Sequence, residues 1–229
     1  MNTKASEWAA ALNEIGEGAR ASFAAKYEAR ERALKLCRDS IRSSANAIRA
    51  VHRGEFSKAQ GLLDSAKGAL REAEDSLSAH KDVYHAGFIA DAQKEYAEAA
   101  ITLAIISGQS LPTPDSLSVP YAPYLNGMGE TVGELRRYLL DQLRKGKTED
   151  CEGLLDIMGE ISTVLATMDF PDSITRGLRH TSDAMRAILE RTRGDVTLSV
   201  VQSTFSSRIQ RLEQRLARID EGAGRTQGQ

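Results

Sequence analysis

Two pairs of glutamates, each at helical spacing, are the residues of this chain that could bind a metal ion. They are Glu95 and Glu98 in DAQKEYAEAA, and Glu130 and Glu134 in GMGETVGELRR. Residues three or four positions apart lie on one face of a helix, so each pair places two carboxylates side by side. If the two helices face each other, the four carboxylates converge. Because desolvated anions are strongly disfavoured unless they are paired, protonated or bound to a cation, a divalent metal is the candidate partner.

The residues around each pair indicate partial burial. Glu95 and Glu98 belong to a polar stripe, and the segment AAITLAII at 99–106 that follows is apolar on nearly every side. A helix that is apolar all round is usually buried. The apolar face that follows Glu134 consists of Leu135, Leu139, Leu140 and Leu143. The alternative is that the acids are solvated, or that they form ion pairs with Lys94, Arg136 or Arg137.

Length and composition are those of an ordinary globular protein. The chain has 229 residues, of which 41% are apolar and 27% charged, enough for one large domain or two small ones. Cys37 and Cys151 are too few for a disulfide scaffold and lack metal-binding spacing, which favours a reduced, cytoplasmic compartment. The N-terminal MNTKASEW lacks the apolar core of a signal peptide, and no apolar run approaches membrane-spanning length. None of the four histidines stands in the Glu-x-x-His pattern of di-iron bundles.

Apolar residues recur with a period of 3.6 and show no strand-like alternation, so the sequence predicts an all-α fold. The predicted helices span 6–51, 55–79, 83–108, 121–145, 148–168, 171–193 and 195–221. The first is very long, with Gly16-Glu17-Gly18 as the point where it could divide, and Arg193-Gly194 separates the last two. A proline-rich loop, LPTPDSLSVPYAP, precedes the fourth. We expect one helical domain over 1–222 and a disordered tail over 223–229.

Basic residues form a stripe along the first predicted helix. Five of them are separated by 3, 4, 7 and 4 positions: Lys35, Arg38, Arg42, Arg49 and Arg53. Such a stripe could follow a nucleic-acid backbone, each cation releasing counterions from the phosphates, with Arg136 or Arg137 adding to it. Because the net charge is −2, any nucleic-acid site must be local. The alternative is a solvated face whose cations pair with Glu28, Glu31 and Asp39.

Four long segments occur in the order found in a known protein family. They are RERALKLCRDSIRSSANAIRAVHRGEF at 30–56, GFIADAQKEYAEA at 87–99, YLNGMGETVGELRRYLLDQLRKG at 124–146 and FPDSITRGLRHTSDAMRAILERTRGDVT at 170–197. On these segments the chain resembles the translin superfamily, which comprises translin and its partner, translin-associated factor X. The resemblance implies a seven-helix bundle of the translin type. It also implies a homo-oligomer, a hollow and roughly octameric shell, as in archaeal-type self-assembling members, that binds single-stranded or structured RNA and single-stranded DNA.

The resemblance also assigns a role to the glutamates. In the factor X branch, acids of an E-x-x-E motif and a D-x-x-G-E motif form an endoribonuclease site with magnesium. The first motif is Glu95-Tyr96-Ala97-Glu98 here, and the second is Glu130-Thr131-Val132-Gly133-Glu134, with glutamate where that branch usually has aspartate. Translin itself lacks this acid set and only binds nucleic acid. By its acids, the present chain resembles the branch that cleaves RNA.

These observations lead to a specific expectation for function. The four glutamates would hold Mg²⁺ or Mn²⁺, since hard oxygen ligands suit these ions, and the site would hydrolyse RNA phosphodiesters while the basic stripe holds the substrate. One alternative is a binding-only, translin-like protein. Another is a helical scaffold without a nucleic-acid role, assembled through the apolar seam of its last helix. That seam consists of Leu198, Val201, Phe205, Ile209, Leu212, Leu216 and Ile219.

Overall fold

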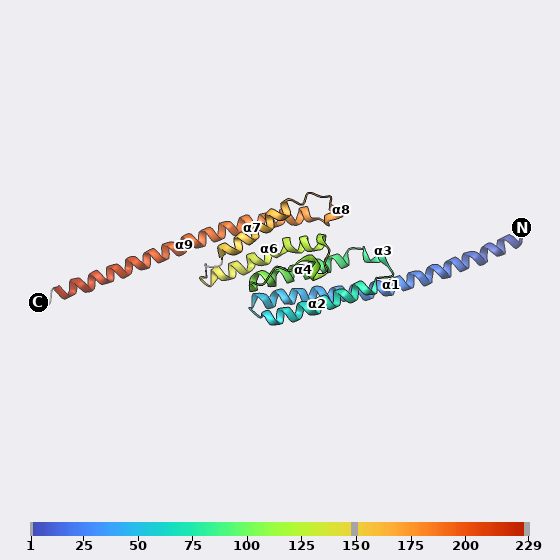
Figure 1. Cartoon of the computed structure of the whole chain (residues 1–229), viewed down its shortest axis with the longest axis horizontal. Helices are drawn as coiled ribbons and strands as arrows, with labels where there is room; N and C mark the ends of the chain where they lie inside the picture. The colour runs from blue at the N-terminus through green and yellow to red at the C-terminus, as the bar shows by residue number, and fades with distance from the viewer. Residues whose placement is uncertain (1, 148–150, 227–229) are drawn as a thin grey trace. The chain divides into compact units, whose positions relative to one another are not determined.

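The described part of the chain is almost entirely helical. The computed structural model describes residues 2–147 and 151–226, and within them it contains helices and no strand. The helices are α1 (Asn2–His52), α2 (Phe56–Ser76), α3 (Lys81–Tyr84), α4 (Phe88–Ser107), α5 (Pro114–Leu117), α6 (Tyr121–Arg144), α7 (Cys151–Ala166), α8 (Asp172–Thr175) and α9 (Leu178–Thr226). The predicted all-α fold with a very long N-terminal helix is confirmed (Figure 1). Across these residues, no helix combines the length and the apolarity that crossing a membrane requires.

The two long terminal helices are continuous. α1 runs through the Gly16-Glu17-Gly18 segment without dividing. α9 runs through Gly194, so the predicted break at Arg193-Gly194 is wrong. A glycine inside a helix costs only about 1 kcal/mol relative to alanine, and neither a proline nor a left-handed residue interrupts the backbone here.

Two predicted helix starts are wrong. The helix predicted from 83 begins at Phe88, after Gly87 at φ 106°, and the helix predicted from 171 is divided into α8 and α9 by Arg176 and Gly177, both at positive φ. The single-turn helices α3, α5 and α8 occupy segments around these breaks and in the proline-rich loop. α5 lies inside the proline-rich loop, where Thr113 caps it by accepting a hydrogen bond from the Ser116 backbone N–H at 3.2 Å. The predicted start of the fifth helix, 148–150, lies outside the described residues. The predicted tail is helical as far as Thr226, and the rest of it, 227–229, also lies outside them.

Contacts divide the chain into two compact units. The first comprises Met1–Thr131 and Asp169–Thr181, and the second comprises Val132–Met168 and Ser182–Gln229. α6 and α9 each contribute residues to both. The prediction of a single domain over 1–222 stays a prediction.

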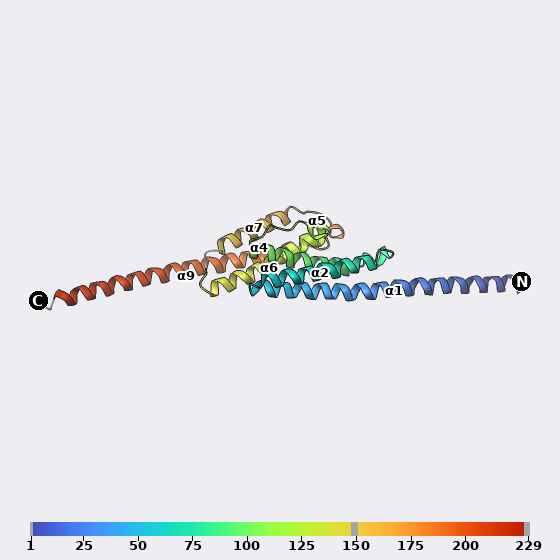
Figure 2. The same ribbon diagram turned by 60° about the horizontal axis from the view of Figure 1, so that its bottom comes forward.

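The first unit is built on α1, α2 and α4, which pack against one another (Figures 1 and 2). Its core is rich in fully buried alanines from all three helices: Ala33, Ala47, Ala50, Ala59, Ala66, Ala73, Ala92, Ala97 and Ala99. Small side chains let helix axes approach closely. As a result α4 is buried on most sides. Its more exposed face over 91–98 consists of Asp91, Lys94, Glu95 and Glu98.

The N-terminal end of α1 extends past α2 and α4 in both views (Figures 1 and 2). Large apolar side chains on this part of α1 are exposed rather than packed: Trp8, Leu12, Ile15, Phe23 and Tyr27. An unpacked row of this kind is unusual for a monomeric soluble protein, whose large apolar patches generally mark interaction surfaces.

The second unit combines the later part of α6 with α7 and most of α9. Each helix buries apolar residues at helical spacing, as with Leu135 and Leu139 on α6 and Met185 and Leu189 on α9. Arg136 links α6 to α9. Its guanidinium donates a hydrogen bond to Thr192 Oγ1 at 3.0 Å and forms an ion pair with Asp195 at 2.8 Å.

Within the first unit, α6 approaches the backbone of α4 at Gly127. A Cβ atom at Gly127 would lie 2.6 Å from the Lys94 carbonyl oxygen and 2.9 Å from the Glu98 nitrogen. Thr131, one turn further along α6, donates hydrogen bonds to the carbonyls of Gly127 at 3.0 Å and Glu98 at 3.4 Å. The two helices therefore touch backbone to backbone, which only glycine allows at this position.

We expect Gly127→Ala to destabilise the fold by about 1–3 kcal/mol, because the added methyl group meets backbone atoms that cannot move independently. Gly68→Ala is the matched control, since Gly68 is an exposed glycine of α2 with open space where its Cβ would stand. It should stabilise the protein by about 0.5–1 kcal/mol through helix propensity. Urea unfolding followed by circular dichroism measures both. A Gly127→Ala variant as stable as wild type would refute the close crossing.

Candidate functional site

Three of the four predicted acids converge where α4 meets α6. Glu95 and Glu98 of α4 and Glu130 of α6 each offer a carboxylate oxygen, and these oxygens lie within 4.8 Å of one another. All three side chains are half-buried. Glu130 reaches this position because it follows Gly127 by three residues and so lies on the same face of α6. We refer to Glu95, Glu98 and Glu130 as the carboxylate group.

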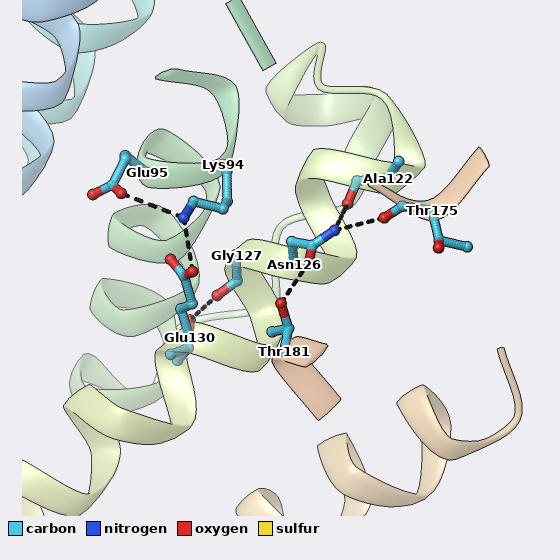
Figure 3. Close-up of polar contacts among 9 residues, drawn as sticks. Lys94, Glu95, Ala122, Asn126, Gly127, Glu130, Thr175 and Thr181 are labelled. Carbon is cyan, nitrogen blue, oxygen red and sulfur yellow. Dashed lines mark hydrogen bonds and ion pairs between the residues drawn. The ribbon is translucent and has the colours of Figure 1, made fainter. Parts of the chain in front are cut away.

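Lys94 lies among these acids. Its Nζ is 2.7 Å from Glu130 Oε1 and 3.7 Å from Glu95 Oε1 (Figure 3). Burial lowers the pKa of Lys94, but the hydrogen bond to Glu130 and the charges of the three glutamates outweigh it and raise the pKa overall. Lys94 is therefore an ammonium ion at neutral pH, and the ion pair that the sequence offered as an alternative is present.

Carboxylates outnumber ammonium groups in this cluster. Three carboxylates and the ammonium of Lys94 share one half-buried place. Burial raises the pKa of Glu95, and the neighbouring charges of Glu130 and Asp91 add to this, whereas Lys94 opposes it. Excess negative charge supplied by oxygen ligands is the chemistry that favours a hard divalent cation such as Mg²⁺ or Mn²⁺.

The fourth acid, Glu134, lies one turn beyond Glu130 on α6, among the residues of the second unit. It is half-buried, and Arg137 forms an ion pair with it at 3.7 Å. The group brought together within 4.8 Å does not include Glu134. Its role as a metal ligand stays a prediction.

The predicted basic stripe is exposed along α1, but several of its members are engaged locally. Arg42 pairs with Asp39, Arg53 with Glu55 at 2.8 Å, and Arg49 donates to Asn46 Oδ1 at 2.8 Å. Lys35 and Arg38 are exposed, and the structure shows no ion pair for them among the residues it describes. Of Arg136 and Arg137 on α6, Arg137 is exposed, whereas Arg136 is held by Thr192 and Asp195.

A cavity of about 240 Å³ adjoins the carboxylate group on the α6 side. Lys94 and Glu130 line it together with Asn126 of α6, Arg176 of the turn after α8, and His180 of α9. Sequence reasoning missed this cavity. Arg176 and Glu130 line the same cavity because the turn after α8 packs against α6, and no sequence spacing encodes that packing.

Solved structures share the architecture of this chain. No family model matches the chain. An uncharacterised protein of Methanocaldococcus jannaschii is 24% identical over 196 residues, which are 83% of this chain and 85% of that protein. Two solved structures are each 32% identical to this chain, with a TM-score of 0.72 over 81% of it. They are AfC3PO, of which the match covers 97%, and AfC3PO in complex with duplex RNA, of which it covers 96%. The crystal structure of apo-NeC3PO, 19% identical with a TM-score of 0.68, covers 82% of this chain and 96% of its own, and shows the fold alone.

The raised pKa of Glu95 predicts a pH-dependent effect of Glu95→Gln in the absence of metal. The folded state disfavours the ionised form of Glu95. The free energy of unfolding of wild type, compared with that of the glutamine variant, therefore falls as pH rises from the unfolded-state pKa to the raised pKa of the folded state. In EDTA, the variant should melt at a higher temperature than wild type near about pH 7–8 and match it near about pH 4. Glu28→Gln, an exposed position on α1, should show no such trend. A variant that melts lower than wild type at neutral pH would contradict this account.

Proposed function

Because this chain belongs to the translin superfamily, we propose that it binds RNA and cleaves it as a metal-dependent endoribonuclease. Membership rests on the two AfC3PO structures, which match most of this chain at 32% identity, and one of them contains duplex RNA. The observation that carries the proposal of cleavage is the convergence of Glu95, Glu98 and Glu130 from two helices. Binding of RNA and assembly into a homo-oligomer are part of the same proposal.

The residues present fit a hard divalent cation. Glu95, Glu98 and Glu130 would hold Mg²⁺ or Mn²⁺, and Glu134 is proposed as a further ligand from the next turn of α6. When bound, such an ion polarises a phosphoryl oxygen and lowers the pKa of a coordinated water, the chemistry of phosphodiester hydrolysis. The surrounding glutamates raise the pKa of Lys94, so once it is released from Glu130 its ammonium can donate a hydrogen bond to a phosphoryl oxygen of the substrate.

The basic stripe supplies a surface for the RNA backbone. The stripe is exposed on α1 and, at Arg53, directly after it: Lys35, Arg38, Arg42, Arg49 and Arg53. The local partners of these cations lie at the surface, so phosphates can compete for the cations at low cost. On α6 we propose Arg137 as a contact, whereas Arg136 serves mainly to hold α9 through Thr192 and Asp195.

One observation favours a binding-only protein as the second candidate. The ammonium of Lys94 already lies 2.7 Å from Glu130, which shows that part of the carboxylate group can be neutralised without metal. If that pairing persisted in the presence of Mg²⁺, the acids would be structural. Cleavage assays distinguish the two candidates.

The wild-type protein should cleave a labelled single-stranded RNA in Mg²⁺ and lose this activity in excess EDTA. Replacing Glu95 and Glu98 together by glutamine should lower the rate by about 100-fold, since both are proposed ligands, while RNA affinity in EDTA is retained. Glu28→Gln removes one exposed acid of α1 and should cleave normally. Cleavage that persists in EDTA or in the double variant would exclude the carboxylate group as the site. Affinity without cleavage in wild type would establish the binding-only candidate.

Assembly is proposed from apolar surface that a single chain leaves uncovered. The exposed row on α1, from Trp8 to Tyr27, has a counterpart on α9 in Leu198, Phe205, Ile209 and Leu212, all more than half exposed. We expect light scattering at micromolar concentration to give the mass of a closed homo-oligomer, with eight subunits as the proposed number. Replacing Phe205 and Ile209 by lysine should shift the mass toward the monomer, because charge in a buried seam is disfavoured. A monomeric wild-type protein would overturn the proposal.

A further inference from the structure

The cavity beside the carboxylate group has one acidic end and one basic end. Glu130 and Lys94 line it where it adjoins the carboxylate group, and Arg176 and His180 line it from the segment that joins α8 to α9. Asp91 also lines it, from the first turn of α4, and would repel an anion there. Lys94 is engaged by Glu130, so Arg176 and His180 are the basic side chains of this lining that a phosphate can meet directly.

Asn126 fixes the geometry between these two ends. This buried residue of α6 donates hydrogen bonds to the carbonyls of Ala122 at 2.9 Å and Thr175 at 2.8 Å. Its side-chain oxygen accepts a third, from Thr181 Oγ1 at 2.6 Å (Figure 3). Thr175 and Thr181 lie on either side of Arg176 and His180 in the chain. The turn that carries the two basic side chains is thus tied at both ends to the helix that carries Glu130.

The backbone at Arg176 adopts a conformation that is rare for residues with a side chain. Arg176 has φ 54° and ψ 47°, the left-handed conformation, and Gly177 follows with φ 81°. Among described residues other than glycine, only Ser118 shares a positive φ. Glycine adopts this conformation without steric cost, so the turn itself does not require an arginine at this position. That side chain is exposed and lines the cavity.

We propose that this cavity binds the RNA phosphate next to the bond that is cleaved, with Arg176 and His180 as positioning residues. The inference rests on the proposed function, because it assigns the cavity to the same substrate. A planar guanidinium suits bidentate contact with phosphate, and an imidazole N–H can add a further donor. At about 240 Å³ the cavity is smaller than the ~300–1,000 Å³ typical of drug-sized ligands, so it fits one part of a nucleotide chain.

Arg176→Gly provides the test, because it removes the guanidinium and leaves the residue that the turn prefers. Binding of a labelled single-stranded RNA is measured in EDTA, so that neither metal nor cleavage enters the result. We expect about tenfold weaker binding, and a dependence of log affinity on log salt that is shallower by about 1, with an unchanged or higher melting temperature. Arg176→Lys should recover part of the affinity, since it restores the charge without the bidentate geometry.

Arg179→Ala is the matched control, because it removes the same charge from an exposed neighbour that does not line the cavity. Its affinity should remain within about twofold of wild type, and its salt dependence should be unchanged. If Arg176→Gly binds as tightly as Arg179→Ala while wild type binds and cleaves RNA, the cavity assignment is wrong and the proposed function stands. If wild-type protein shows no RNA affinity at low salt, both are overturned.

Discussion

The contact between the backbones of α4 and α6 at Gly127 is the constraint on which the site depends. No other residue fits there, because a Cβ atom would lie 2.6 Å from the Lys94 carbonyl oxygen. The hydroxyl of Thr131 reinforces the contact, because it can donate to the Glu98 carbonyl of α4 as well as to the Gly127 carbonyl of its own helix. With the helices this close, the face of α6 that carries Glu130 must meet the face of α4 that carries Glu95 and Glu98. A wider separation would leave Glu130 of α6 apart from the Glu95 and Glu98 pair of α4.

The electrostatics of the site follow from this crossing. Because α4 is packed on most sides, Lys94, Glu95 and Glu98 lie on its less buried face beside α6, and partial burial there raises the pKa of Glu95. Lys94 supplies one positive charge against three carboxylates, and Glu130 in turn keeps it protonated. Concentrating negative charge on two rigid helices lowers the free energy of unfolding even when no ligand is bound. Such an arrangement is well suited to bind a cation and poorly suited to contribute stability.

Part of this structure could be predicted from sequence and part could not. Helical periodicity predicted α4 and α6, and the glutamate spacings predicted which acids share a face. Whether the two faces meet depends on the absence of a Cβ at Gly127, which periodicity does not encode. The predicted break at Gly194 was wrong because one glycine costs too little to end a helix that neither a proline nor a left-handed residue interrupts. The Asn126 hydrogen bonds join residues about 50 positions apart, beyond any local pattern.

The central claim is that Glu95, Glu98 and Glu130 bind a divalent cation. The most direct measurement is anomalous scattering from a crystal soaked in Mn²⁺. The account predicts an anomalous peak bounded by the carboxylates of these three residues, with the Lys94 ammonium displaced from Glu130. A crystal that shows no peak there, and in which Lys94 Nζ remains 2.7 Å from Glu130 Oε1, would contradict it.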